Sequence, residues 1–208
     1  RDCLLSRGLG DVYKRQAPTW LVQSRLSPFP GTAVANWLFD EGSLTRRLTR
    51  LSHNAFSVTP LVQEWQTLRN DECAALGLPE QSEGWVREVY LRGHGQAWVF
   101  ARSVAARSAL LEGGLNIDEL GSRSLGELLF CDQAFTRQPI EVCRYPRHWL
   151  PAAVADNGLW GRRSRFDRGP LSLLVAEIFL PSLWTAIDAR PEACLLYTSP
   201  SPRDKRQS

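Results

Sequence analysis

The chain has no methionine, only two lysines and only three histidines among its 208 residues. Its five cysteines are odd in number and form no Cys-x-x-Cys motif, which argues against a disulfide framework and a zinc site. His53, His94 and His148 are scattered and lack metal-ligand spacing. No run of eighteen apolar residues occurs, so no transmembrane helix is expected. The N-terminus also lacks the pattern of a secretory signal. These absences predict a soluble, cytoplasmic protein.

The two ends differ in composition from the rest of the chain. Residues 17–192 hold 18 basic and 19 acidic residues, so the overall charge of +3 comes from the ends and predicts no nucleic-acid partner. Both lysines, Lys14 and Lys205, lie in the ends, which also repeat short fragments of each other. The ends resemble translated sequencing-adaptor artefacts, although genuine basic tails are an alternative. We therefore expect non-native tails at 1–16 and 193–208 around one domain at 17–192.

Hydrophobic residues make up 43% of the whole chain, which is sufficient for a substantial core in this domain. The periodicity predicts an α+β fold, a single domain with an antiparallel sheet of about six strands and few helices, because strands and helices do not alternate. Residues 69–84 are expected to form a loop with at most one short helical turn. Residues 145–157 are expected to be an irregular insertion, and Pro60 indicates an edge strand or a bulge. The expected strands are 56–65, 85–91, 97–104, 140–143, 159–166 and 171–180, and the expected helices are 32–41, 44–51 and 125–130.

Two charged residues lie inside otherwise apolar strands. Side chains alternate between the faces of a strand, so Arg87 shares a face with Trp85 and Val89. Glu177 has apolar residues on both faces of its strand. A buried charge without compensation costs several kcal/mol. A structural ion pair, between these two or with Glu88 or Arg102, and a charged ligand both satisfy this requirement.

Two predicted helix starts add possible anion donors. Leu44 follows Ser43, and Leu125 follows Ser124 in a Ser-x-x-Glu capping box. The first N–H groups of a helix have no partner within the helix and lie at its positive end. Two such ends beside Arg87 would make a carboxylate site.

Several sequence blocks resemble the chorismate pyruvate-lyase family, as a pseudomonad-like bacterial member, and they occur in the family's order over most of residues 20–185. The most specific is Gly-Leu-Trp-Gly-Arg-Arg-Ser-Arg, which ends at Arg165. The other blocks are Trp-Leu-Phe-Asp-Glu-Gly-Ser-Leu-Thr-Arg-Arg at 37–47, Trp-Val-Arg-Glu at 85–88, Ser-Leu-Gly-Glu-Leu-Leu-Phe at 124–130 and Ala-Glu-Ile-Phe-Leu-Pro at 176–181.

The resemblance implies a single-domain antiparallel sheet with helical flaps over a buried site. It implies conversion of chorismate to 4-hydroxybenzoate and pyruvate, the first committed step of ubiquinone synthesis, by a monomer without a metal or cofactor. It also implies that Arg87 and the backbone amides of Leu44 and Leu125 hold the ring carboxylate. Glu177 would then bond the ring oxygen at the opposite end, as the candidate proton-handling group.

Chorismate has a second carboxylate, on its enolpyruvyl group. Arg102, or an arginine from 162–165, is a candidate to bind it. Two rivals stay open: a non-catalytic module that binds small acids, as in the effector domains of some transcription regulators, and a lyase or hydrolase that forms another product from chorismate. In every case the expected partner is a small molecule, with neither nucleic acid nor membrane insertion.

Overall fold

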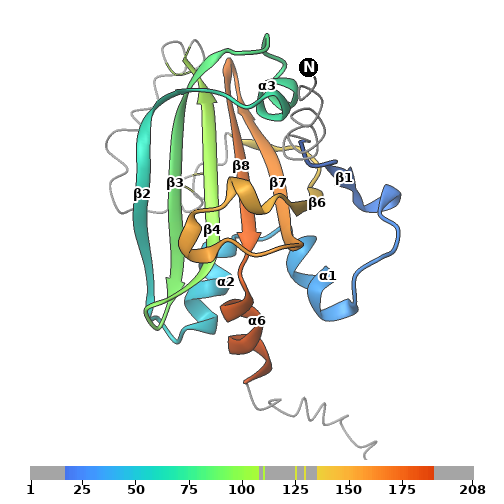
Figure 1. The fold of residues 1–208 in the computed structure, drawn as a ribbon, viewed down its shortest axis with the longest axis vertical. Coiled ribbons are helices and arrows are strands. Elements are labelled where there is room, and N and C mark those ends of the chain that lie inside the picture. The colour runs from blue at the N-terminus through green and yellow to red at the C-terminus, as the bar shows by residue number, and fades with distance from the viewer. Residues whose placement is uncertain (1–16, 108–109, 111–124, 126–128, 130–134, 190–208) are drawn as a thin grey trace, which may run out of the picture.

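The computed structural model describes residues 17–107 and 135–189, together with residues 110, 125 and 129 between them. Its centre is one antiparallel sheet with the strand order β1-β6-β7-β8-β4-β3-β2, in which β5 pairs with β7 (Figure 1). The strands are β1 Leu21–Val22, β2 Phe56–Thr67, β3 Glu83–Gly93, β4 Gln96–Ala106, β5 Thr136–Arg137, β6 Glu141–Tyr145, β7 Leu159–Arg168 and β8 Leu171–Phe179.

Short helices cover the sheet on both sides. In the described residues, α1, α2 and α6 pack against one end of the sheet on one side, and α3 lies on the other side with two 3₁₀ turns (Figure 1). The α-helices are α1 Thr32–Leu38, α2 Leu44–Leu51, α3 Asn70–Leu76 and α6 Pro181–Asp188, and the 3₁₀ turns are η1 Gln23–Arg25, η3 Arg147–Trp149 and η4 Ala152–Val154.

The α+β class, the single domain and the antiparallel sheet agree with the expectation from the sequence. The expected strand count was too low: the sheet has eight strands in the described residues. Two of them, β1 and β5, are two-residue strands that are too short to show a period. Residues 69–84, expected to form a loop with at most one short helical turn, contain the seven-residue helix α3. The first turn of α3 is fixed by the Glu72 carboxylate, which accepts from the Arg69 backbone N–H at 2.9 Å. The helix α6 was also missed; Pro181 ends β8, as expected, but is itself the first residue of that helix.

The hairpin of β3 and β4 follows the sequence closely. Its turn at Gly93-His94-Gly95 is possible because His94 and Gly95 have positive φ angles, 50° and 76°. On the other side of β3 lies β2, an edge strand in the described part of the sheet, with a bulge between Pro60 and Val62. The position of Pro60 thus agrees with the rule that proline avoids the middle of a regular ladder.

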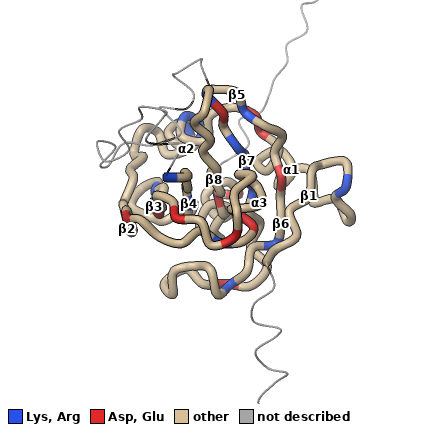
Figure 2. The backbone as a smooth tube through the Cα atoms, turned by 90° about the horizontal axis from the view of Figure 1, so that it is seen from above, with Lys and Arg blue, Asp and Glu red and all other residues tan. Residues whose placement is uncertain are grey.

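The register divides the strand side chains into two faces. The site face carries Arg87, its β4 partner Ser103 and the β8 partner of Ser103, Val175. The back face carries the alternating residues, such as Val86 and Val104. Acidic and basic positions are interspersed over the described strands and helices (Figure 2).

Candidate active site

A row of residues in register crosses the site face. Arg87 on β3 is paired with Ser103 on β4, which is paired with Val175 on β8, which is paired with Ser164 on β7. We call these four residues the central row. Ser103 and Ala101 are the β4 residues of this face beside Arg87 and Glu177, and both are buried. Small side chains in the middle of the row and charged ones around it suit a flat, polar-ended ligand.

Arg87 lies at the β3 end of the central row and is only 3% exposed. Its Nε donates to Gln63 Oε1 of the neighbouring strand β2 at 3.1 Å. Burial lowers the pKa of Arg87, because desolvation disfavours the charged form. A guanidinium nevertheless stays protonated at neutral pH. The site face thus presents a buried cation whose orientation is fixed by an amide oxygen.

Glu177 lies on the same face, two residues along β8 from Val175. Its Oε2 accepts from Arg162 Nε at 2.7 Å, in an ion pair of which the arginine side chain is 2% exposed and the carboxylate side chain 16% exposed. Because β4 separates β3 from β8, the backbones of Arg87 and Glu177 lie about 10 Å apart across the sheet. The two charges therefore bond to different described partners, Gln63 and Arg162.

Arg162 also ties the sheet to the end of α1. Its Nη1 donates to the carbonyl oxygens of Trp37 at 3.0 Å and Asp40 at 2.8 Å. Those carbonyls lie at the C-terminal end of a helix, where a cation is favoured. One buried guanidinium thus fixes both the carboxylate of Glu177 and the backbone that leads into α2.

The junction between α1 and α2 is held by a second set of contacts. Asp40 accepts from the Gly42 N–H at 2.8 Å and from Arg47 Nη1 at 2.7 Å. Desolvation acts to raise the pKa of Asp40, but the Gly42 N–H and the Arg47 guanidinium together lower it below its usual value. Ser43 then caps α2 by accepting from the Arg46 N–H at 3.4 Å, so Leu44 is the first residue of the helix, as expected.

Two apolar clusters lie on either side of the central row. Leu44 belongs to one, with Val89 and Ala101. Leu125 belongs to the other, with Ala105 and Leu173. The capping box that includes Ser124 and Glu127, and the rest of the helix expected there, lie outside the described residues; Leu125 itself is helical and buried. The two expected amide donors therefore belong to residues on opposite sides of the row.

Arg137 of β5 contacts the central row at its β7 end. Its Nε donates to Ser164 Oγ at 3.0 Å and its Nη1 to the Glu41 carbonyl at 2.9 Å. The pKa of Arg137 is lowered, first by burial and then by the nearby positive charge of Arg162, while Glu177 acts in the opposite direction. Arg137 is thus electrostatically coupled to the Arg162–Glu177 pair.

Arg102 points from the back face instead. Its Nε donates to Glu72 Oε1 at 2.6 Å and its Nη1 to Glu88 Oε1 at 2.8 Å. Burial by itself would lower the pKa of Arg102, but these two carboxylates raise it above its usual value. The expectation that Arg102 joins Arg87 and Glu177 at one ligand therefore does not fit its position, because adjacent side chains of a strand alternate and Arg102 lies between the site-face residues Ala101 and Ser103.

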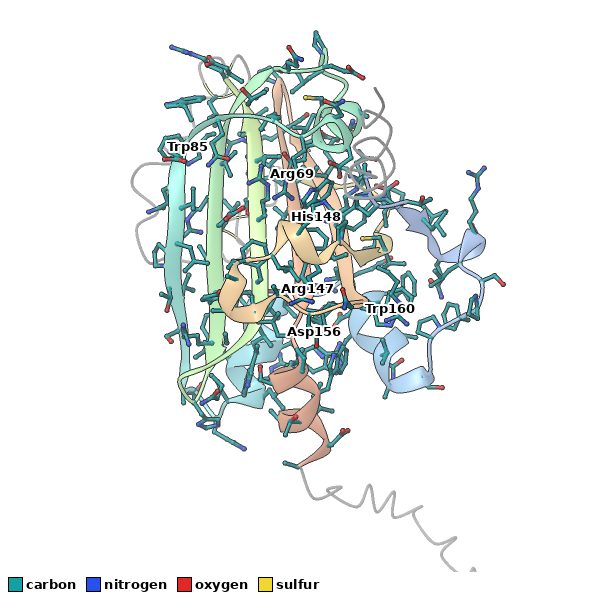
Figure 3. The ribbon with its side chains drawn as sticks, viewed as in Figure 1. Arg69, Trp85, Arg147, His148, Asp156 and Trp160 are labelled. Carbon is teal, nitrogen blue, oxygen red and sulfur yellow. The ribbon has the colours of Figure 1, made fainter. Side chains whose placement is uncertain are left out.

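The back face holds further ion pairs, which attach neighbouring elements to the sheet. Arg163 bonds Glu141 at 2.8 Å and Asp71 at 3.2 Å. Arg69, labelled in Figure 3, lies at the start of α3. It donates to the Tyr145 hydroxyl at 2.7 Å and lies over the Trp149 ring of η3. These contacts attach α3 and η3 to the sheet.

Two site-face arginines were not singled out from the sequence. Arg162 was one of several candidates in the 162–165 block, and alternation along β7 would have separated it from Arg163 and Arg165. Arg137 lies in a strand of two residues, which gives no period from which its face could be predicted.

The fold and this geometry define an α+β protein whose sheet carries charged side chains beside a central row that lies between two apolar clusters. The chain belongs to the chorismate lyase family, whose family model matches residues 14–189. None of the described helices combines the length and the apolar character that crossing a membrane requires.

Curated relatives cover most of the chain. A Pseudomonas fluorescens protein named "Probable chorismate pyruvate-lyase" is 99% identical over 86% of this chain and 95% of its own length. A protein of a second strain of that species, "Probable chorismate pyruvate-lyase 2", is 74% identical over 86% of this chain and 97% of its own. Among solved structures, the PhnF C-terminal domain has a TM-score of 0.48 at 16% identity, covering 64% of this chain and 88% of that domain.

Proposed function

We propose that the protein removes the enolpyruvyl group of chorismate as pyruvate and releases 4-hydroxybenzoate, the first committed step of ubiquinone synthesis. Membership of the chorismate lyase family supports the substrate. The observation that carries the proposal is the placement of Arg87 and Glu177 on one sheet face, with the small side chain of Ala101 between their strands.

In this proposal the ring lies over Ala101 and Ser103 of β4, between Arg87 and Glu177. Its carboxylate pairs with the Arg87 guanidinium and accepts from the backbone amides of Leu44 and Leu125, which belong to the clusters on either side. A charge-assisted bond to a buried guanidinium is about twice as strong as a neutral one. The opposite end of the ring, which bears the hydroxyl group, then lies towards Glu177.

The reaction needs a proton to leave the ring and an ether bond to break. Loss of the hydrogen from the ring carbon that bears the hydroxyl group, with cleavage of the ether C–O bond at the neighbouring ring carbon, gives aromatic 4-hydroxybenzoate. The enolpyruvate that leaves takes up a proton and becomes pyruvate. Aromatisation supplies the driving force, so positioning and electrostatics are the protein's contribution.

Glu177 is the group that we assign to handling the proton and orienting the hydroxyl end. Its ion pair with Arg162 fixes the position of the carboxylate, which suits a group that accepts a hydrogen bond from the ring hydroxyl. Arg162 acts as a positioning residue, because it holds Glu177 and the α1 carbonyls at the same time. We also propose that the enzyme is a monomer and that it acts in the cytoplasm.

Incubation of the protein with chorismate, followed by quantification of both products, tests the proposal. Equal amounts of 4-hydroxybenzoate and pyruvate are expected. Binding of chorismate or 4-hydroxybenzoate without turnover would favour a small-acid-binding module, and a different aromatic or cyclohexadiene product would indicate a related chorismate enzyme. Either result would contradict the proposal.

A further inference from the structure

Three short side chains of β4 follow one another on the site face: Ala101, Ser103 and Ala105. Across the sheet, Ser103 lies between Arg87 on β3 and Val175 on β8. Apart from Arg87, the side chains that adjoin Ser103 on this face are therefore short or apolar. The serine adds one hydroxyl to a strand that carries alanine at the positions before and after it on the same face.

The hydroxyl of Ser103 has no partner among the described residues. Ser103 is buried, with 8% of its surface exposed, and within the part of the chain that the structure describes its Oγ forms no hydrogen bond. Other strand serines differ: Ser164 Oγ accepts from Arg137 Nε at 3.0 Å, and Ser172 Oγ donates to Asp167 Oδ1 at 2.6 Å. A buried hydroxyl without a bond costs free energy, so this group requires a partner.

The register shows which end of a ligand would meet Ser103. Directly opposite residues of an antiparallel pair have Cβ atoms about 5 Å apart, and Ser103 is opposite Arg87. Arg87 Nε bonds Gln63 of β2, on the side away from β4. A carboxylate that pairs with Arg87 above β4 would therefore come within reach of the Ser103 hydroxyl. The end of the ligand near Glu177 would lie over Ala101 instead, because these two residues are partners.

We propose that Ser103 Oγ donates a hydrogen bond to the ring carboxylate and is a further binding residue of the site. A serine hydroxyl rotates to suit its acceptor, and a carboxylate accepts several hydrogen bonds, so Ser103 acts together with Arg87 and does not compete with it. The assignment rests on the proposed function, because it takes the ring carboxylate to lie at Arg87. Chorismate and 4-hydroxybenzoate both carry this carboxylate, so both should form the bond.

Removal of the hydroxyl tests the proposal by ligand binding. Ser103→Ala leaves the side chain that β4 already carries at Ala101 and Ala105. The Kd of 4-hydroxybenzoate should rise about tenfold, which is the lower part of the range for a hydrogen bond to a charged group. The Kd of benzoate, which keeps the carboxylate and lacks the ring hydroxyl, should rise by the same factor. Calorimetric titration measures both constants. The melting temperature of the ligand-free variant should not fall, because no described residue loses a hydrogen bond.

Ser172→Ala is the matched control. Ser172 is a serine of the neighbouring strand β8, and it points from the back face because it alternates with Leu171 and Leu173. Its hydroxyl is bonded to Asp167. Its loss should lower the melting temperature and leave the Kd of 4-hydroxybenzoate and of benzoate within about twofold of the wild type.

Three results would overturn the assignment of Ser103. Unchanged affinity for 4-hydroxybenzoate in Ser103→Ala would remove the hydroxyl from ligand binding. Weaker 4-hydroxybenzoate binding with unchanged benzoate binding would place it at the other end of the ring. A fall in melting temperature like that of Ser172→Ala would show that it supports the fold.

The proposed function is tested separately in the same experiment. A wild-type protein that bound neither ligand would overturn the proposed function, and the assignment of Ser103 with it. Conversion of chorismate by the wild type, together with unchanged affinity in Ser103→Ala, would overturn the assignment alone.

Discussion

Arg162 Nε and Glu177 Oε2 lie 2.7 Å apart in a partly buried ion pair, and the same guanidinium bonds the Trp37 and Asp40 carbonyls. The carboxylate assigned to the chemistry is thus coupled to the backbone that precedes α2. Displacement of either partner would move both the proton-handling group and the start of the helix.

Replacement of Arg162 should separate a positioning role from a packing role. We expect Arg162→Gln to lower kcat by about a hundredfold or more, because Glu177 loses its orienting partner, and to lower the free energy of unfolding by about 3 kcal/mol. Arg162→Lys should regain part of the activity. Steady-state kinetics and denaturant unfolding measure the two effects.

Arg163 is the control, because it is the next residue and is also buried and paired with carboxylates, but on the back face. Arg163→Gln should cost a similar amount of stability with less than about a fivefold change in kcat. Equal losses of kcat in both variants would show that activity merely follows stability.

Removal of the Arg87 side chain should weaken ligand binding. Arg87→Ala deletes the cation assigned to the ring carboxylate, so the Kd of 4-hydroxybenzoate should rise by about ten- to a hundredfold. Calorimetric titration with 4-hydroxybenzoate measures it. Gln63→Ala, which removes only the Nε contact of Arg87, should have a smaller effect; unchanged affinity in Arg87→Ala would remove this residue from the site.

Acid should loosen the junction between α1 and α2. The folded-state pKa of Asp40 is lowered, so its contribution to stability is present above its unfolded pKa of about 4 and is lost as the pH falls through the folded value. The pair with Arg47 is about one-third exposed, so the effect should stay below about 1 kcal/mol. Between pH 7 and pH 3, the melting temperature of Asp40→Asn should therefore fall less than that of the wild type. A fall at least as large in the variant would contradict this role.

The ends of the chain offer a deletion test. We propose that residues 1–16 and 193–208 contribute nothing to folding or activity, since they differ in composition from the rest of the chain. A protein of residues 17–192 should keep the melting temperature within a few degrees and kcat/KM within about twofold. A large loss of either would assign a role to the ends.

The sequence predicted the long elements well and the short ones poorly. The runs at β3, β4, β7 and β8 are long enough for a period of two to appear, and Ser43 fixed the start of α2. The two-residue strand β5 has no period, so Arg137 could not be assigned to a face.

At the site, the sequence predicted which face a residue occupies but not which residues of other strands lie beside it. Alternation placed Arg87 correctly beside Trp85 and Val89 on one face, but the partner of Glu177 depends on which strand lies next to β8. That order is set by tertiary pairing, so the sequence did not predict Arg162 as the partner of Glu177. An arginine from 162–165 was a candidate only for the second carboxylate of the ligand. Alternation applied to Ala101, Arg102 and Ser103 would have separated Arg102 from the site once β4 was aligned with β3.

Turnover of chorismate by the wild type and by Glu177→Gln, with 4-hydroxybenzoate and pyruvate quantified in the same samples, tests the central claim most directly. The wild type should form the two products in equal amounts. Glu177→Gln should stay folded and bind 4-hydroxybenzoate, since Arg87 is intact, but turn over at least about a hundredfold more slowly. No product from the wild type, or wild-type turnover in the variant, would contradict the account.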